Sequence, residues 1–163
     1  MELRVSEQDS VNTAYFARCA QGRFCLQRCD QCRLLHYPPS AGCPWCGSAG
    51  FAWDEVEARG TVYSYSEVQH AVQPGFAPHS PYMVLLVELD TQRGQPTADE
   101  AIRVLGNLVR PDGTPASPQE VARVGIGTRV KMAFTRLGEH MALPQWTIDE
   151  ASPAKAWRAE MKR

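Results

Sequence analysis

The chain has 163 residues, a hydrophobic content of 44% and a formal net charge of −1 at pH 7. This length and composition support one compact domain with a small additional unit. The balanced charge argues against a basic face of the kind that binds nucleic acid or acidic lipid. No apolar stretch reaches the roughly 18 residues that span a membrane, and residues 1–10 lack the apolar core of a signal peptide. We therefore expect a soluble, cytoplasmic protein.

A short helix is predicted over residues 9–20, within an N-terminal segment 1–21. Asp9 or Ser10 can cap its first turn. Apolar residues then recur at the spacing of one helix face: Val11, Ala14, Tyr15 and Cys19. A helix of this length is marginal in water on its own. Its apolar side therefore needs a partner, either the body of this chain or another chain.

Four cysteines form two Cys-x-x-Cys pairs that are separated by ten residues: Cys29, Cys32, Cys43 and Cys46. Each pair on a tight turn aims two thiolates at one point, and two such turns supply the tetrahedral sulfur shell that Zn²⁺ prefers. The separation is close to that of rubredoxin-like ribbons. Four sulfurs leave no coordination position for water, so the pattern predicts structural rather than catalytic zinc.

Other uses of these cysteines stay open. Iron could occupy the same sulfur shell. Two disulfides would need an oxidising compartment, and a thioredoxin-like redox motif would use one pair near a βαβ pattern, which is not visible here. Cys19 and Cys25 fall outside the spacing and are interpreted as buried or half-buried thiols. His36 lies between the pairs, but the four cysteines suffice as ligands.

The ribbon segment, residues 22–53, is too small to bury a core of its own. Strands are predicted at 23–27 and 51–53, on either side of the cysteine turns. Metal binding to such a segment supplies on the order of 10–16 kcal/mol and takes the place of a core. Its aromatic residues cannot all be buried within it: Phe24, Tyr37, Trp45 and Phe51. We expect Tyr37 and Trp45 to lie near a protein–protein surface, where aromatic residues are enriched.

Residues 54–150 are predicted to form a barrel. Alternating or continuous apolar runs indicate five strands, at 61–68, 82–89, 102–109, 128–134 and 142–148. Ser117 can cap a brief helical turn between the third and fourth strands. Five strands with a helical connection at that place are typical of the OB-fold, although short strands with turn signals also occur in sandwiches.

A short polar helix is predicted for the C-terminal tail, residues 151–163. It begins at Ser152 and carries Trp157 and Met161 on one side. It either docks on the barrel or frays. The predicted fold is thus mainly β, with an N-terminal helix, a rubredoxin-like zinc ribbon, a five-stranded OB-fold barrel and a short C-terminal helix.

Motifs in the ribbon and barrel together carry a family resemblance. The most specific are Tyr15-Phe16, the run from Phe24 to Cys32, Tyr37-Pro38-Pro39, the run from Cys43 to Ser48, Trp53, and Gly60-Thr61-Val62-Tyr63-Ser64. Looser matches are Val87-Glu88-Leu89, Leu105-Gly106-Asn107 and Gly125-Ile126-Gly127. With these motifs, which cover residues 15 to about 148, the chain resembles the acyl-CoA-associated OB-fold proteins. It departs from them at Arg33, where the family often has glycine, at Ser40, where it often has arginine, and at Tyr15-Phe16, where it usually has Phe-Trp.

The resemblance implies a non-catalytic partner protein that assembles with a CoA-ester enzyme. Members associate with thiolase-like enzymes, with hydroxymethylglutaryl-CoA synthase-like enzymes or with hot-dog-fold enoyl-CoA hydratases, in lipid, sterol and polyketide pathways. There the ribbon and OB-fold help to shape the acyl-CoA channel or stabilise the enzyme subunit. The residues themselves agree, since none of the four histidines lies in a nucleophile elbow or a His-Glu-x-x-His helix: His36, His70, His79 and His140.

Two other functions remain possible at this point. A zinc ribbon with an OB-fold can bind single-stranded nucleic acid on stacked aromatics, here Tyr63, Tyr65 and Phe134, although the charge balance argues against it. An independent enzyme acting on acyl-CoA thioesters is the other. If this chain touches CoA directly, Arg103 on the third strand is one candidate for the positive charge, with the loop 74–81 bordering an apolar slot. An arginine on a barrel strand is, however, more often a surface ion pair.

Overall fold

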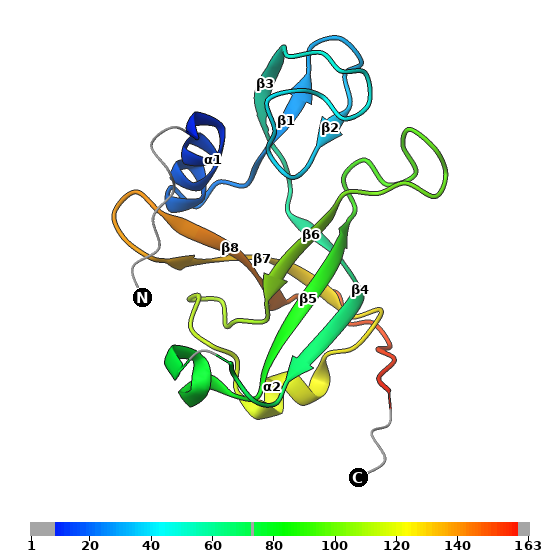
Figure 1. The fold of residues 1–163 in the computed structure, drawn as a ribbon. Coiled ribbons are helices and arrows are strands. Elements are labelled where there is room, and N and C mark those ends of the chain that lie inside the picture. Colours follow the sequence, from blue (N-terminus) through cyan, green and yellow to red (C-terminus); the bar gives the residue numbers. More distant parts are fainter. Residues whose placement is uncertain (1–8, 73, 160–163) are drawn as a thin grey trace.

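The computed structural model describes residues 9–72 and 74–159, and Figure 1 shows a small ribbon unit above a larger barrel. The ribbon sheet holds β1 (Cys25–Cys29), β2 (Leu35–His36) and β3 (Phe51–Glu55). The barrel holds β4 (Arg59–Val68), β5 (Tyr82–Leu89), β6 (Arg103–Asn107), β7 (Arg129–Arg136) and β8 (Ala142–Ile148). The helices are α1 (Ser10–Ala20), the 3-10 helix η1 (Pro74–His79) and α2 (Pro118–Arg123). The chain is therefore mainly β, as predicted.

The helix α1 is the predicted N-terminal helix, and local signals fix both of its ends. Asp9 caps it by accepting a hydrogen bond from the backbone N–H of Asn12 at 3.0 Å. At the other end Gly22 adopts a left-handed φ of 74°. The N–H groups of Gly22 and Arg23 then donate to the carbonyls of Cys19 and Arg18, as in a Schellman motif.

The apolar side of α1 packs against its own chain, between the ribbon and the hairpin of β7 and β8 (Figure 1). Tyr15 is buried, and its ring lies 6.4 Å from that of Trp53 in the ribbon, in stacked orientation. On the barrel side, Arg136 of β7 donates a hydrogen bond of 2.7 Å to the carbonyl of Ala20. The helix α1 thus contacts both the ribbon and the barrel and joins them. Its apolar side packs on the body of the same chain, which is one of the two partners that the sequence left open.

The five barrel strands lie in the order β6-β5-β4-β7-β8, all antiparallel. A bulge at Tyr63 bends β4. Its first residues, 59–61, pair with β7, and residues 60–68 other than Tyr63 pair with β5. Trp146 of β8 closes the barrel against β6 and its continuation. Its backbone carbonyl accepts from the N–H of Val109 at 2.7 Å, and its indole N–H donates to the carbonyl of Val104 at 3.3 Å.

The barrel interior follows from strand alternation. Along β5 every second side chain is buried: Met83, Leu85, Val87 and Leu89. These pack around Trp146, which is fully buried. The predicted strands 82–89 and 142–148 have the observed bounds, and the predicted helical turn is α2. Its cap Ser117 forms a reciprocal capping box with Glu120.

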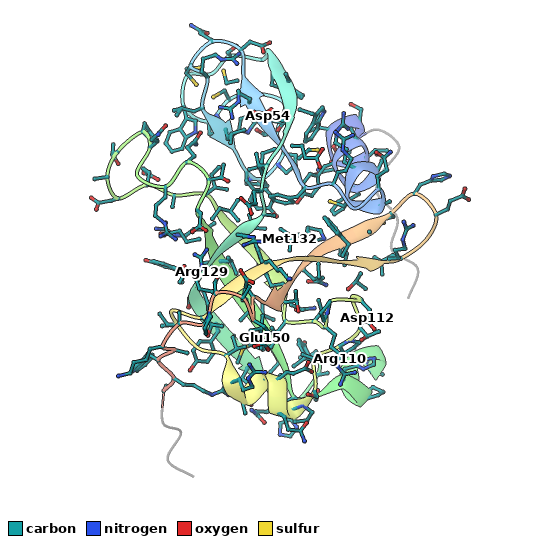
Figure 2. All side chains as sticks on the ribbon, turned by 180° about the vertical axis from the view of Figure 1, so that it is seen from behind. Asp54, Arg110, Asp112, Arg129, Met132 and Glu150 are labelled. Carbon is teal, nitrogen blue, oxygen red and sulfur yellow. The ribbon has the colours of Figure 1, made fainter. Side chains whose placement is uncertain are left out.

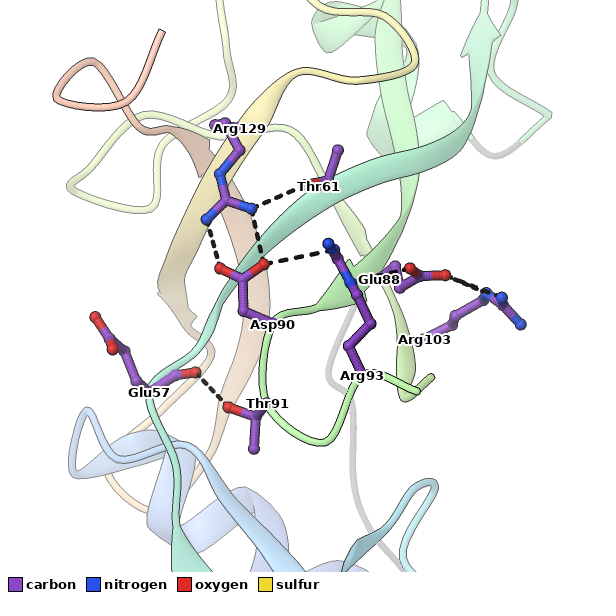
Figure 3. Close-up of polar contacts among 8 residues, drawn as sticks. All are labelled: Glu57, Thr61, Glu88, Asp90, Thr91, Arg93, Arg103 and Arg129. Carbon is purple, nitrogen blue, oxygen red and sulfur yellow. Dashed lines mark hydrogen bonds and ion pairs between the residues drawn. The ribbon is translucent and has the colours of Figure 1, made fainter. Parts of the chain in front are cut away.

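A chain of ion pairs braces the end of the barrel that faces the ribbon (Figure 3). Asp90, just after β5, accepts hydrogen bonds of 2.8 and 2.5 Å from the guanidinium of Arg129 on β7. These bonds hold the pKa of Asp90 below its usual value. Arg93 bridges Asp90 and Glu88, so the turn that follows β5 is held to the neighbouring strands.

The predicted C-terminal helix is wrong for the described residues 151–159, which are not helical. Trp157 instead exchanges two backbone hydrogen bonds with Ile126, of 2.7 and 2.8 Å. Arg158 donates to the carbonyls of Val121 and Val124 at the end of α2. These bonds to the barrel replace helical ones, because a short polar tail with few apolar residues has no face to bury as a helix. Met161 lies outside the described residues.

Within residues 9–72 and 74–159, no helix is both long and apolar enough to cross a membrane.

Candidate metal centre

The four cysteines meet at the end of the ribbon, on two turns that follow β1 and precede β3. Their Sγ atoms all lie within 4.8 Å of one another. The pairs Cys29–Cys46 and Cys32–Cys43 are each separated by 3.6 Å. Ligands about 2.3 Å from a tetrahedral zinc ion lie about 3.8 Å apart. The arrangement therefore fits the sulfur shell that the sequence spacing predicted.

The two turns have the same backbone construction. In the first, the N–H of Arg33 donates to the carbonyl of Cys29 at 3.1 Å, and in the second the N–H of Gly47 donates to the carbonyl of Cys43 at 2.9 Å. A second bond closes each turn, since the N–H of Cys29 donates to the carbonyl of Leu34 at 3.0 Å and the N–H of Cys43 donates to the carbonyl of Ser48 at 2.8 Å. The repeat aims the two thiols of each turn at a common point.

Both turns also end in a left-handed residue. Gly47 has a φ of 77° and Arg33 has a φ of 65°. Glycine adopts this conformation without steric cost, whereas a residue with a Cβ does not. The glycine that the family resemblance implies at the position of Arg33 would adopt this φ without strain, whereas this chain keeps the turn with a residue that has a Cβ.

The thiols influence one another's ionisation. The backbone N–H groups of Cys32 and Gln31 point at the sulfur of Cys29 and lower its pKa to about 6. At Cys32 the backbone N–H of Leu34 also lowers the pKa, but desolvation and the surrounding thiols outweigh it and raise the pKa to about 12. Four thiolates so close together need a cation to neutralise them, and a divalent metal with soft-ligand affinity meets that need.

The other candidate ligands are not part of this group. His36 is buried, and no metal-ligating group among the described residues includes it. Desolvation lowers its pKa, and its Nδ1 lies 3.5 Å from the hydroxyl of Ser40. Cys19 and Cys25 are buried free thiols, as predicted. Burial raises the pKa of Cys19 to about 12, so this thiol is poorly reactive.

The ribbon aromatics divide into buried and exposed sets. Phe24 is buried, and Tyr37 is half-buried with its ring 6.2 Å from that of Tyr15 on α1. Trp45, between the second pair of cysteines, is 41% exposed. Its indole N–H points at the carbonyl of Leu35 at 3.4 Å. Of the two aromatics expected at a protein–protein surface, Trp45 is the one that the chain leaves most open.

Arg103 lies on β6 and is held by its neighbours (Figure 3). Its guanidinium donates hydrogen bonds of 3.2 and 2.9 Å to the carboxylate of Glu88, the residue opposite it on β5. It also lies 4.3 Å from the ring centre of Tyr63. This is the surface ion pair that sequence reasoning gave as the common role of a strand arginine.

A groove of about 210 Å³ lies where the ribbon meets the barrel, a feature that the sequence gave no reason to expect. Its lining combines apolar side chains, among them Phe24, Val56, Met132 and Phe134, with the cations Arg59 and Lys131 and the carboxylates Glu55 and Glu57. Figure 2 shows Met132 on the side of the barrel that faces the ribbon, with Asp54 beyond it. The groove arises because the linker between β3 and β4 passes along β7, which no local pattern specifies.

The three aromatics considered for nucleic-acid stacking contact different parts of the chain. Phe134 lines this groove beside the ribbon. Tyr65 accepts a hydrogen bond of 3.0 Å from the N–H of Ala159 in the tail, and Arg158 lies over its ring. Tyr63 is covered on one side by Arg103. They do not present one continuous stacking surface, so the geometry gives the nucleic-acid hypothesis no support.

Comparison with known proteins identifies both units. Residues 16–52 match the family described as "ChsH2, rubredoxin-like zinc ribbon domain", and residues 53–135 match "ChsH2, C-terminal OB-fold domain". In Thermomonospora curvata, a protein described as "Probable enoyl-CoA hydratase alpha subunit" is 43% identical over 100 residues. That match covers 60% of this chain and 27% of the relative, so the chain spans about a quarter of the relative's length.

Two solved structures share the fold. A chain of "Ltp2-ChsH2(DUF35) aldolase" superposes with a TM-score of 0.67 and 30% identity, over 89% of this chain and 98% of that one. A DUF35-family protein of unknown function from Sulfolobus solfataricus superposes with a TM-score of 0.51 and 14% identity, over 88% of this chain and 90% of that one. The second likeness concerns the fold alone.

The substitution Cys43→Ser tests the metal shell. Loss of one sulfur ligand should lower zinc affinity by more than about a hundredfold, since even residues that only support a ligand contribute ten- to a hundredfold. Amides of the cysteine turns should lose protection from hydrogen exchange, whereas those around Trp146 should keep it because the barrel has its own core. Ala41→Ser, on the same loop, is the control. Equal zinc affinity in both variants would contradict the assignment.

The substitution Arg33→Gly should tighten the first turn. Removing the Cβ at a φ of 65° relieves left-handed strain, for a net gain of about 0.5–1 kcal/mol after the added chain entropy of glycine. Zinc transfer to a competing chelator should then be slower. Gly47→Ala should have the opposite effect, and because no atom lies within 4 Å of the new Cβ, its cost would come from the backbone alone. Faster zinc loss from the Arg33→Gly variant would show that the turn is unstrained.

Proposed function

Because this chain belongs to the ChsH2 family of zinc-ribbon and OB-fold proteins, we propose that it is a non-catalytic accessory subunit of a CoA-ester enzyme. The match of both units in the family order, over residues 16–135, carries the proposal. Two relatives of 30% identity or more support an association with an enzyme, since one is described as "Probable enoyl-CoA hydratase alpha subunit" and the other is a chain of "Ltp2-ChsH2(DUF35) aldolase". The partner is then a thiolase-like or hydratase-like enzyme.

In this proposal the four cysteines hold a structural zinc ion. The four convergent sulfurs support that role, because they would take all four positions of a tetrahedral zinc ion and leave none for water or substrate. Zinc would supply the ribbon with the stability that its small interior cannot. The chain's contribution to the reaction would be to present a rigid surface that shapes or stabilises the enzyme.

Trp45 is the side chain that we assign to the partner contact. It projects from the cysteine turn, is 41% exposed, and its backbone is fixed by the hydrogen bonds of that turn. Tryptophan, with tyrosine and arginine, is enriched among the residues that dominate binding energy at protein interfaces. A rigidly mounted one loses little conformational entropy on association.

Co-expression with CoA-ester enzymes encoded next to this chain tests the proposal. We expect a stable complex, and Trp45→Ala should weaken it by about 2 kcal/mol, or roughly thirtyfold in Kd, with little change in barrel melting. Leu137→Ala is the matched control, because Leu137 is 42% exposed at the β7–β8 turn. Absence of any complex, together with no CoA binding by calorimetry, would rule the proposal out.

Direct contact with the acyl-CoA is a finer part of the proposal. Arg103 remains the predicted contact, although Glu88 already pairs with it. The groove between ribbon and barrel offers apolar side chains with Lys131 at its edge, and no ion pair involves Lys131 among the described residues. Glu55 and Glu57 also line the groove, but they pair with Arg23 and Arg59. The apolar side chains therefore suit the pantetheine arm of CoA, and Lys131 suits a phosphate.

The variants Arg103→Ala and Lys131→Ala distinguish these contacts. Loss of a phosphate-binding charge should raise the KM of the assembled enzyme for its CoA ester several-fold while kcat stays near its normal value. A rise for only one variant would assign the contact to that side chain. Unchanged KM in both, with the complex intact, would indicate that the subunit acts only through the partner's structure.

A further inference from the structure

We propose that Gln92 is a positioning residue that fixes the zinc ribbon in one orientation on the barrel. It lies in the turn that follows β5, far in sequence from the ribbon. Its side-chain amide makes two hydrogen bonds with one ribbon residue. The Oε1 atom accepts from the N–H of Leu35 at 2.7 Å, and the Nε2 group donates to the carbonyl of Leu35 at 2.9 Å.

The amide of Gln92 takes the place of a neighbouring strand. Leu35 begins β2, the edge strand of the ribbon sheet, and pairs with Arg28 of β1 on its other side. In an antiparallel sheet an edge residue that directs its N–H and C=O away from its neighbour leaves both unpaired. Gln92 supplies one acceptor and one donor to this pair of groups, as a fourth strand beside β2 would. Because Leu35 is almost fully buried, leaving its N–H without this acceptor would be costly.

The backbone of Gln92 is strained to make this contact. Its φ is 62°, and apart from Arg33 it is the only residue other than glycine with a positive φ among residues 9–72 and 74–159. A non-glycine residue persists in that conformation where its surroundings over-determine it. At Gln92 the conformation is fixed by two sets of bonds: the side-chain hydrogen bonds to Leu35, and the hydrogen bonds that hold the preceding turn to the barrel.

The base of the turn is rigid (Figure 3). The N–H of Asp90 donates to the carbonyl of Arg59 at 3.0 Å, and its carboxylate is held by Arg129. Thr91 donates through its hydroxyl to the carbonyl of Glu57 at 3.3 Å. The two residues before Gln92 are therefore both held in place by hydrogen bonds. Through its own bonds to Leu35, Gln92 then fixes the position of the ribbon relative to the barrel.

The contact also reaches the metal turns. Leu35 follows the first turn, and the carbonyl of Leu34 closes that turn by accepting from the N–H of Cys29. Trp45 of the second turn points its indole N–H at the same Leu35 carbonyl that Gln92 engages. Leu35 and its neighbours thus connect both cysteine turns with the loop that follows β5. A partner that contacts ribbon and barrel together would meet a surface already oriented, which reduces the entropy cost of binding.

Amide hydrogen exchange of the zinc-loaded full chain tests the proposal. Gln92→Asn keeps the amide and tolerates a positive φ, but it is one methylene too short to reach Leu35. The Leu35 amide, whose acceptor is Gln92, should exchange at least about fivefold faster, as expected for the loss of two hydrogen bonds. Zinc content and the exchange of barrel amides near Trp146 should not change. Thr97→Ala, on the same loop, is the control and should behave as wild type.

Residual dipolar couplings complete the test by reporting the ribbon's orientation. In the wild type a single alignment tensor should fit the couplings of both the ribbon and the barrel. In Gln92→Asn, motion of the ribbon relative to the barrel should reduce the ribbon couplings. Gln92→Glu is a second variant of full length, which keeps an acceptor for the Leu35 N–H but lacks the donor for the Leu35 carbonyl, so its ribbon couplings should also be reduced. Unchanged Leu35 exchange in Gln92→Asn, with unchanged couplings in both variants, would overturn the proposal.

The consequence for binding rests on the proposed function. If the fixed orientation of the ribbon contributes to assembly, Gln92→Asn should weaken association with the partner enzyme several-fold, although no interface side chain has changed. A wild-type chain that binds no such enzyme would refute the proposed function, and Leu35 exchange would still decide the role of Gln92. A loosened ribbon with undiminished affinity would show that orientation is not needed for assembly.

Discussion

The convergence of four cysteine sulfurs is the constraint on which the rest of the structure depends. The ribbon has two short β pairings and almost no interior, so its turns need an additional source of stability. Sγ atoms within 4.8 Å of one another repel as thiolates and attract a divalent metal. Two turns with equivalent hydrogen bonds set that geometry, even though one of them ends in a left-handed arginine.

The ribbon is also held to the barrel, which the metal alone cannot achieve. The helix α1 inserts Tyr15 among ribbon aromatics while Arg136 holds its end to β7. On another side, Gln92 pairs with the edge of β2. Few side chains carry these contacts, and each has a fixed position. The consequence is a single composite surface of ribbon and barrel, from which Trp45 projects.

Local patterns in the sequence predicted much of this. The spacing of Cys29, Cys32, Cys43 and Cys46 implied their convergence, and the apolar runs at 82–89 and 142–148 gave the bounds of β5 and β8. What failed depended on contacts between distant segments. The two-residue β2 has no periodicity, and its pairing with Gln92 appears only when the turn after β5 is in place. The tail was misjudged as a helix because Trp157 and Arg158 bond to Ile126 and α2, which no local signal reveals.

The most direct test of this account is zinc X-ray absorption on protein purified without chelator, combined with elemental analysis. The account predicts about one zinc per chain, with four sulfur neighbours at about 2.3 Å and no light-atom ligand. A well-folded preparation with an ordered ribbon and no metal would contradict it. So would a zinc ion whose ligands include nitrogen or oxygen, because the site would then not be the closed four-cysteine shell on which the rest of the argument stands.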